Sequence, residues 1–267
     1  MLSRPRKIGV FDSGVGGLTV YKELLELLPD ESFLYLGDTA RVPYGIRSPE
    51  TICKYSLQNC LFLLEKGAEL IVVACNTATA SALPYLQSEL KVPVLGVIEP
   101  GVRTALATTR SKRVGVIATE TTIRSGVYAE ALKARDANLV CVSQATSLFV
   151  PLVEEGVMSE AILFPIFDHY LKIFARENVD TLILGCTHYP ILKPHLQCYL
   201  GDGIALVDSA RATAETVKDY LAGFSEKKPI LVKETPLLFV TDAPERISRI
   251  AEKILGGRRL RIEKIEV

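Results

Sequence analysis

The sequence alternates short runs of β-branched and aliphatic residues with longer stretches of helical pattern. Each of four such runs precedes a helix-like stretch: 8–11, 33–36, 70–74 and 92–97. Alternation of this kind is typical of βαβ units, in which crossover helices join parallel strands. The sequence therefore predicts an α/β protein built on parallel sheets.

The pattern begins again in the second half of the chain. Further strand-like runs follow at 114–118, 139–142 and 182–185. Gly9 in the first series corresponds to Gly115 in the second, and Cys75 corresponds to Cys186. The number of residues that separates the two glycines is nearly the same as the number that separates the two cysteines. We interpret this as an internal repeat and expect two similar parallel-sheet α/β domains related by pseudo-two-fold symmetry.

The expected first domain comprises residues 1–98 and 208–267, and the expected second domain comprises residues 99–207. At 98–101 an apolar strand gives way to turn residues, and we place the first boundary there. The second half is expected to end near 207–209.

The last part of the chain contains no further cysteine turn. Residues 210–222 have a helical pattern, and a helical run at 244–255 lies between strand-like residues 237–240 and 260–267. We expect this part to complete the first domain. Ligands of open parallel sheets bind beyond the carboxyl ends of the strands, so the active site is expected in the cleft between the two domains.

The charge balance argues against large charged partners. Lys and Arg total 31, as do Asp and Glu, so no overall field favours nucleic acid or an anionic membrane. We interpret the basic cluster at 258–261 as an exposed strand edge. Apolar runs of about six residues are far below the roughly 18 that span a bilayer. Residues 1–7 lack the apolar core of a signal peptide, so we expect a cytoplasmic protein.

Six cysteines in a chain of this kind are better interpreted as free thiols than as a disulfide framework. Four of them lie in ordinary amphipathic or apolar contexts, where cysteine acts as a small hydrophobe: Cys53, Cys60, Cys141 and Cys198. Cys75 and Cys186 differ, because each follows a predicted strand at the start of a predicted helix.

The two cysteine turns favour reactive thiols. Asn76 and Thr77 are expected to cap the helix that follows Cys75, and Pro190 suits the first turn of the helix after Cys186. A thiol at a helix N-terminus lies at the positive end of the dipole, so we expect its pKa to fall from about 8.5 toward neutrality.

Two like residues on opposite walls of a cleft suit inversion of a carbon centre. One group removes the proton from one face and the other returns a proton to the opposite face. Because the repeat supplies one cysteine per half, we expect amino-acid racemisation, with Cys75 and Cys186 as the two bases.

The neighbouring polar residues suit an amino-acid ligand. Ser13, Asn76, Thr77 and Thr187 are candidates to hold an α-carboxylate. Asp12 would pair with the substrate ammonium or assist Cys75, and His188 would do likewise for Cys186; these roles stay open at this stage. His169 and His195 lie on helix-like stretches and are expected to have no role in the site.

Residues 12–17 have the glycine content of a phosphate loop. They lack the Gly-Lys-Ser/Thr of one nucleotide-binding motif and the final glycine of the other, where Thr19 stands. We interpret them as a tight strand-to-helix turn that exposes Asp12 and Ser13 at its rim.

Five blocks of the sequence, in order, resemble the glutamate racemases of the aspartate/glutamate racemase superfamily: 11–18, 37–45, 74–79, 149–154 and 184–190. The resemblance implies an enzyme without cofactor or metal that interconverts L- and D-glutamate, supplies D-glutamate for peptidoglycan and is commonly a homodimer. Related aspartate racemases tend to have glutamate at the position of His188, so the histidine favours glutamate.

The resemblance also assigns residues to roles. It implies proton transfer by Cys75 and Cys186, with assistance from Asp12, His188 and Glu154. The substrate contacts that it implies are Asp12, Ser13, Tyr44, Gly45, Asn76, Thr77, Thr187 and His188. Without the resemblance, the segment that contains Tyr44 and Gly45 would be interpreted as a surface turn.

Several alternatives remain at this stage. The same scaffold could carry a racemase for another acidic amino acid such as aspartate, or an isomerase or decarboxylase that uses one cysteine. A two-domain binding protein of the periplasmic type is disfavoured by the N-terminal sequence. A metal module using Cys186 and His188 is disfavoured because the cysteines are scattered and form no Cys-x-x-Cys pair.

Overall fold

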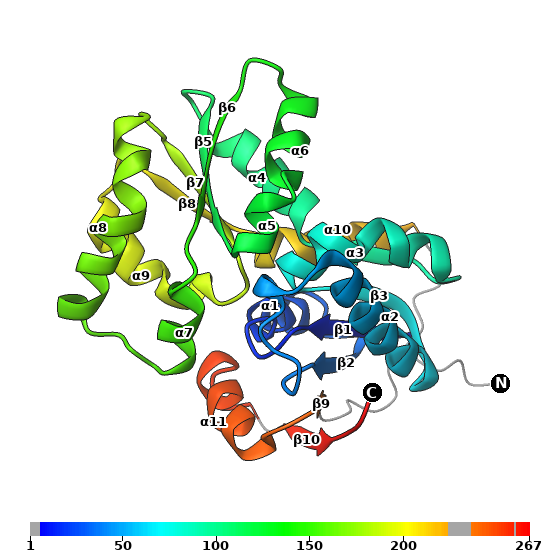
Figure 1. Cartoon of the computed structure of the whole chain (residues 1–267). Coiled ribbons are helices and arrows are strands. Elements are labelled where there is room, and N and C mark those ends of the chain that lie inside the picture. Colours follow the sequence, from blue (N-terminus) through cyan, green and yellow to red (C-terminus); the bar gives the residue numbers. More distant parts are fainter. Residues whose placement is uncertain (1–5, 224–235, 259) are drawn as a thin grey trace.

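Two parallel sheets organise the chain in the computed structural model, which describes residues 6–223, 236–258 and 260–267 (Figure 1). The six-stranded sheet has the order β10-β9-β2-β1-β3-β4. Its strands are β1 Lys7–Asp12, β2 Ser32–Gly37, β3 Ala68–Val73, β4 Val94–Gly96, β9 Leu237–Val240 and β10 Arg261–Lys264. The four-stranded sheet has the order β6-β5-β7-β8. Its strands are β5 Arg113–Ala118, β6 Val140–Ala145, β7 Thr181–Gly185 and β8 Ala205–Asp208.

The strand order confirms the predicted repeat and fold class. The order β2-β1-β3-β4 in the first sheet is matched by β6-β5-β7-β8 in the second, and every pairing of the described strands is parallel. Cys75 follows β3 and Cys186 follows β7, so the two cysteines stand at equivalent strand ends. The residue boundaries of the two domains stay a prediction.

Helices cover the sheets, and side chains from alternate strand positions pack against them. In β1, Ile8 and Val10 join one buried cluster and Phe11 joins the cluster on the opposite face. The helices are α1 Leu18–Leu27, α2 Pro49–Glu65, α3 Asn76–Glu89, α4 Ile98–Thr108, α5 Glu120–Arg124, α6 Val127–Arg135, α7 Phe149–Glu154, α8 Glu160–Arg176, α9 Tyr189–Leu200, α10 Ala210–Ala222 and α11 Pro244–Ile254, with a 3₁₀ turn η1 at Tyr44–Ile46.

The matching glycines of the repeat have a packing explanation. A Cβ atom at Gly9 would lie 2.9 Å from Ile71 Cδ1 on β3, and one at Gly115 would lie 2.8 Å from Leu182 Cδ1 on β7. Phe174 on α8 is equally close to Gly115. Both glycines therefore allow a close approach of neighbouring side chains at the same place in the two sheets.

The expectations for the last part of the chain are confirmed, and the one for residues 98–101 is wrong. The helix at 210–222 and the strand at 237–240 occur as predicted, and β9 and β10 extend the six-stranded sheet beyond β2. Residues 98–101, expected as a turn, instead form the first turn of α4. The prediction took Pro100 as a turn residue. Proline is also tolerated in the first turn of a helix, because the backbone N–H groups there have no helical partner.

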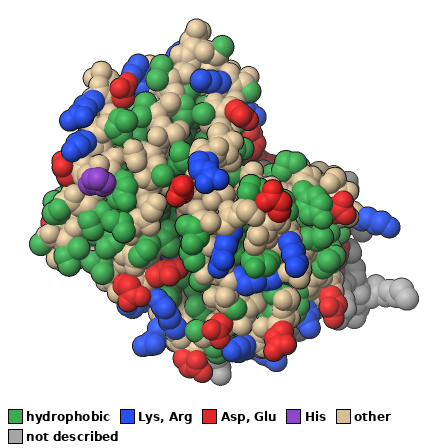
Figure 2. Space-filling view, viewed as in Figure 1, with side chains coloured by type: hydrophobic (Ala, Val, Ile, Leu, Met, Phe, Trp, Pro, Cys, Tyr) green, Lys and Arg blue, Asp and Glu red, His purple; other side chains and the backbone are tan. Residues whose placement is uncertain are grey.

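Charged side chains of both signs are mixed on the face shown in Figure 2. Arg261 lies exposed on the edge strand β10, as the strand-edge interpretation expected, whereas Arg259 and residues 1–5 lie outside the described residues. No helix in the described part of the chain is long and apolar enough to cross a membrane.

Candidate active site

The carboxyl ends of β1, β3 and β7 bring the predicted residues of both sheets together. Asp12 ends β1, Cys75 follows β3 and Thr187 follows β7 by two residues. Thr187 Oγ1 donates a hydrogen bond to Asp12 Oδ1 at 3.2 Å, and Thr19 Oγ1 donates to the Thr187 carbonyl at 3.3 Å. The two halves of the predicted site are therefore in direct contact.

The Cys75 turn differs from the prediction in its cap. Cys75 is itself the N-cap of α3, and its Sγ accepts a hydrogen bond from the Ala78 N–H at 3.4 Å. The same sulfur lies 3.4 Å from Ser13 Oγ. Asn76 and Thr77 are the first two residues of the helix rather than its caps, so their side chains are left for other partners.

The expected lowering of the thiol pKa is wrong for Cys75. The side chain is buried, and burial together with the charge of Asp12 raises the pKa of Cys75 to about 12. The hydrogen bonds that the sulfur makes with Ser13 and Ala78 oppose this rise but are outweighed. The charge of Cys186 also raises the pKa of Cys75, which places the two thiols within electrostatic reach of each other.

Cys186 lies in a chain of three ionisable groups. Its Sγ is 3.7 Å from His188 Nδ1, and His188 Nε2 is 3.3 Å from Glu154 Oε1, without the geometry of a directed hydrogen bond. Burial alone would lower the pKa of His188, but Cys186 and Glu154 raise it to about 10. His188 in turn lowers the pKa of Glu154. The contacts with Cys186 and Glu154 therefore favour a protonated His188 imidazole beside the Cys186 sulfur.

Replacing Glu154 with glutamine is expected to lower the pKa of His188, because the carboxylate is one of the groups that raise it. The titration midpoint of the His188 ring should move by roughly one pH unit to lower pH, which NMR of the ring Cε1–H measures. Glu155→Gln is the matched control, because Glu155 pairs with Arg246 at 3.3 Å on the surface. An equal shift in both variants would contradict the Glu154–His188 pair.

The same shift has a consequence for stability. An unfolded histidine has a pKa near 6.5, and the folded value is higher. Protonation of His188 therefore stabilises the fold fully below about pH 6.5, and this contribution is lost as the pH rises toward 10.

Asp12 is buried at the centre of the site. Its Oδ2 accepts a hydrogen bond from the Gly14 N–H at 2.9 Å, and its Oδ1 accepts from Thr187. Burial raises the pKa of Asp12, while the charge of His188 opposes the rise. The carboxylate thus interacts with both turns: its charge raises the pKa of Cys75, and it accepts a hydrogen bond from Thr187 in the turn after Cys186.

Threonine hydroxyls that the sequence analysis did not find join the site. Thr77 Oγ1 lies 2.9 Å from Thr119 Oγ1 and 3.1 Å from Thr122 Oγ1. Thr119 caps α5 directly after β5, the strand equivalent to β1 in the repeat. The matching position, which in the first sheet holds Ser13, was therefore a signal for Thr119.

The loop that carries Tyr44 and Gly45 bridges the two sheets. Tyr44 is buried, and its hydroxyl donates to the carboxylate of Asp38 and accepts from Asn59 Nδ2 at 3.1 Å. The Gly45 carbonyl accepts from Thr121 Oγ1 at 2.8 Å. Tyr44 is therefore anchored within the six-stranded domain, while Gly45 reaches α5 of the other.

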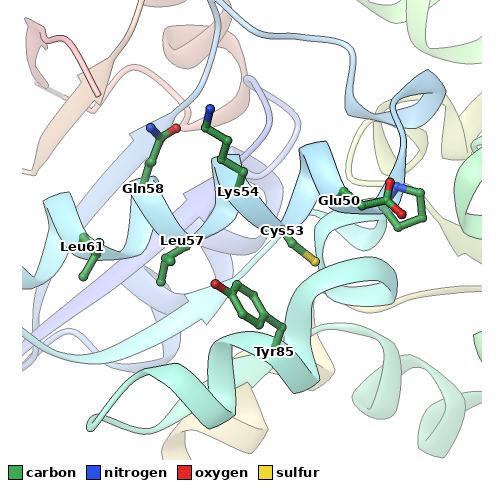
Figure 3. A pocket seen from close by; sticks show the side chains of 8 residues that line it. Glu50, Cys53, Lys54, Leu57, Gln58, Leu61 and Tyr85 are labelled. Carbon is green, nitrogen blue, oxygen red and sulfur yellow. The ribbon is translucent and has the colours of Figure 1, made fainter.

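Other features lie outside this constellation. An apolar groove of about 570 Å³ lies between α2 and α3 (Figure 3). Its lining includes Cys53, Leu57, Leu61 and Tyr85, none of which was predicted for the site. Among the described residues, no group of three His, Cys, Asp or Glu side chains could hold a metal ion.

Comparisons with known proteins agree over nearly the whole chain. A family model described as Asp/Glu/Hydantoin racemase matches residues 8–217. A glutamate racemase of Geobacter metallireducens is 49% identical over 253 residues, which cover 95% of this chain and 94% of the relative. One of Aquifex aeolicus is 51% identical over 250 residues, which cover 94% of each chain.

Solved structures agree with the sequence relatives. Glutamate racemase isoform RacE1 of Bacillus anthracis has a TM-score of 0.93 at 37% identity and covers 98% of both chains. The glutamate racemase of Francisella tularensis, solved in complex with D-glutamate, has a TM-score of 0.88 at 36% identity and the same coverage.

Proposed function

This chain belongs to the Asp/Glu/hydantoin racemase family and is an amino-acid racemase, and we propose that it interconverts L-glutamate and D-glutamate by proton transfer between Cys75 and Cys186. The relatives at 49% and 51% identity are glutamate racemases, and the Francisella tularensis relative binds D-glutamate. Glutamate is therefore the substrate that the comparisons support best.

The observation that carries the mechanism is the equivalent placement of the two thiols. They follow β3 and β7, which hold equivalent places in the matching four-strand orders β2-β1-β3-β4 and β6-β5-β7-β8, and the charge of Cys186 raises the pKa of Cys75. A substrate carbon held between them would present one face to each sulfur. Inversion of that carbon requires a base on one face and an acid on the other.

We assign the two thiols different roles in one direction of the reaction, from the contacts that each sulfur makes. Cys75, with a raised pKa, is the protonated thiol and the acid. Cys186, paired with His188, is the base for the α-proton. After transfer, Cys186 holds the substrate proton and Cys75 has given its own to the opposite face. The reverse reaction starts from the opposite protonation states.

The proposed assisting roles follow from the contacts. Glu154 raises the pKa of His188, which places a protonated imidazole 3.7 Å from the Cys186 sulfur. Asp12 is placed to receive the substrate ammonium, which would offset the negative charge that raises the pKa of Cys75. No cofactor or metal takes part in these steps.

We propose further substrate contacts from residues on both sides of the site. Asn76 Nδ2 is buried and has no hydrogen-bond partner in the part of the chain that the structure describes, which suits a donor that meets a ligand carboxylate. Hydroxyl and backbone groups complete the set: Ser13, Tyr44, Gly45, Thr77, Thr187 and His188. Because these groups come from two sheets, the complete set of substrate contacts depends on the contact between the domains.

The wider biological roles rest on the family resemblance. We propose that the D-glutamate product is used for peptidoglycan, that the enzyme acts in the cytoplasm and that it forms a homodimer. The domain division at residues 98 and 208 is also a proposal. It is supported by α10, whose Ala210, Ala214 and Val217 pack in one buried cluster with α1 and β1.

Incubation with L-glutamate in deuterated water tests the function. Without pyridoxal phosphate and with a metal chelator present, optical rotation should decay while deuterium enters the α-position. L-Aspartate in a parallel sample serves as the control for substrate class. Retention of rotation and of the α-proton with glutamate, or faster turnover of aspartate, would refute the proposal.

A further inference from the structure

Tyr128 lies between the two cysteine turns and contacts both. It is the second residue of α6, and Gly126, with φ of 71°, provides the sharp turn that begins this helix. The Tyr128 hydroxyl donates to Asn76 Oδ1 at 2.6 Å, next to Cys75. On the other side, a Cβ atom at Gly185 would lie 3.1 Å from Tyr128 Cε2, next to Cys186.

The hydrogen bond from Tyr128 fixes which end of the Asn76 amide faces the site. With Oδ1 bound to the phenol, Nδ2 is left without a hydrogen-bond partner among the described residues. Both side chains are 3% exposed. Buried amide donors are nearly always paired, so an unpaired one beside a proposed base indicates a place for an acceptor on the ligand.

The phenol is suited to act as a fixed donor. Burial raises the pKa of Tyr128, and the charge of Cys186 raises it further, so the hydroxyl keeps its proton over the working range of pH. The ring packs in a buried cluster with Val116, Leu132 and Ile183. A rigid ring with a permanent donor can hold a neighbouring amide in one orientation.

Building on the proposed function, we propose that Tyr128 is a positioning residue. Its hydroxyl orients the Asn76 carboxamide so that Nδ2 donates to a carboxylate of the amino-acid substrate. Without this hydrogen bond, the amide could rotate by half a turn and present its oxygen, which repels an anion. Tyr128 therefore acts on substrate binding through Asn76 and takes no part in proton transfer.

Tyr128→Phe tests this role, because it keeps the ring and removes only the hydroxyl. We expect KM for both L- and D-glutamate to rise about tenfold, because the hydrogen bond from Asn76 Nδ2 to the charged ligand would be lost. We expect kcat to change less than about threefold. In an Asn76→Ala background, the same substitution should leave KM unchanged. Coupling of this kind separates an effect through Asn76 from a general loss of packing.

Tyr21→Phe is the matched control, because the Tyr21 hydroxyl is also buried but has no hydrogen-bond partner within residues 6–223, 236–258 and 260–267. Its KM and kcat should equal those of the wild type. The Asn76 side-chain amide resonance gives a readout without turnover. It should shift when D-glutamate is added to the wild type and shift little in Tyr128→Phe.

The outcomes separate the two proposals. An inactive wild type would overturn the proposed function. An active wild type with unchanged KM in Tyr128→Phe would overturn only the role of Tyr128. An equal rise of KM in the presence and absence of Asn76 would do the same, since it would show that Tyr128 acts by another route.

Discussion

Replacing either Cys75 or Cys186 with serine is expected to lower the rate of glutamate racemisation by roughly 10³-fold, the usual range for loss of a general acid or base. A serine hydroxyl is a much weaker acid than a thiol, so it neither accepts nor supplies the α-proton at a useful rate. Circular dichroism of the glutamate solution, started from each enantiomer, measures the loss in both directions.

The two variants should differ in what they retain. Each keeps one intact sulfur, so each should still exchange the α-proton of one enantiomer with deuterated water, and the enantiomer should differ between the two. Cys60→Ser is the control, because Cys60 is buried in the core of the six-stranded domain and should leave the kinetics unchanged. Loss of activity in only one of the two variants would instead support a single-cysteine isomerase or decarboxylase.

The fold was largely predictable because its local signals agree with its global arrangement. Strand-like runs such as 8–11 and 114–118 became the central strands β1 and β5. The repeat of glycine and cysteine predicted two sheets of the same kind. Sequence patterns did not give the strand order, because pairing depends on contacts between distant segments rather than on local periodicity.

The site was predictable where a residue follows a central strand. Cys75 and Cys186 have this position and Asp12 is the last residue of β1, and the structure brings their turns together. The pKa of Cys75 was predicted in the wrong direction because the helix N-terminus was considered without burial and the charge of Asp12. Both are properties of the packed domains, which the sequence does not display.

Tyr128 shows a second limit of sequence reasoning. It lies in the short helix α6, and its neighbours in sequence do not mark it as part of a site. Its proximity to Asn76 comes from the way the two domains pack, across 52 positions of the chain. Glu154 is similar, since its resemblance-based assignment gains a physical reason only from its 3.3 Å approach to His188.

Gly16→Ala is expected to lower kcat/KM for glutamate by about 10²-fold. A Cβ atom at Gly16 would lie 2.4 Å from Thr187 Oγ1 and 2.6 Å from His188 Nδ1, so the turn after Cys186 would have to move. A displacement of about 1 Å at a catalytic group is enough for a loss of this size. Steady-state kinetics in both directions measure it, and thermal unfolding reports whether the fold is retained.

Gly14→Ala is the matched control for this effect, because it adds the same methyl group to the same loop. Its Cβ would lie 3.6 Å from Val42 Cγ2, an ordinary contact, so kcat/KM should stay within about threefold of the wild type. Neither glycine has a positive φ, so neither position requires glycine for its backbone conformation. The two variants differ in the collision with Thr187 and His188, which only Gly16→Ala produces. Equal losses in kcat/KM would mean that an added methyl group disturbs the loop at either position. The spacing between the Asp12 loop and the Cys186 turn would then not be what limits catalysis.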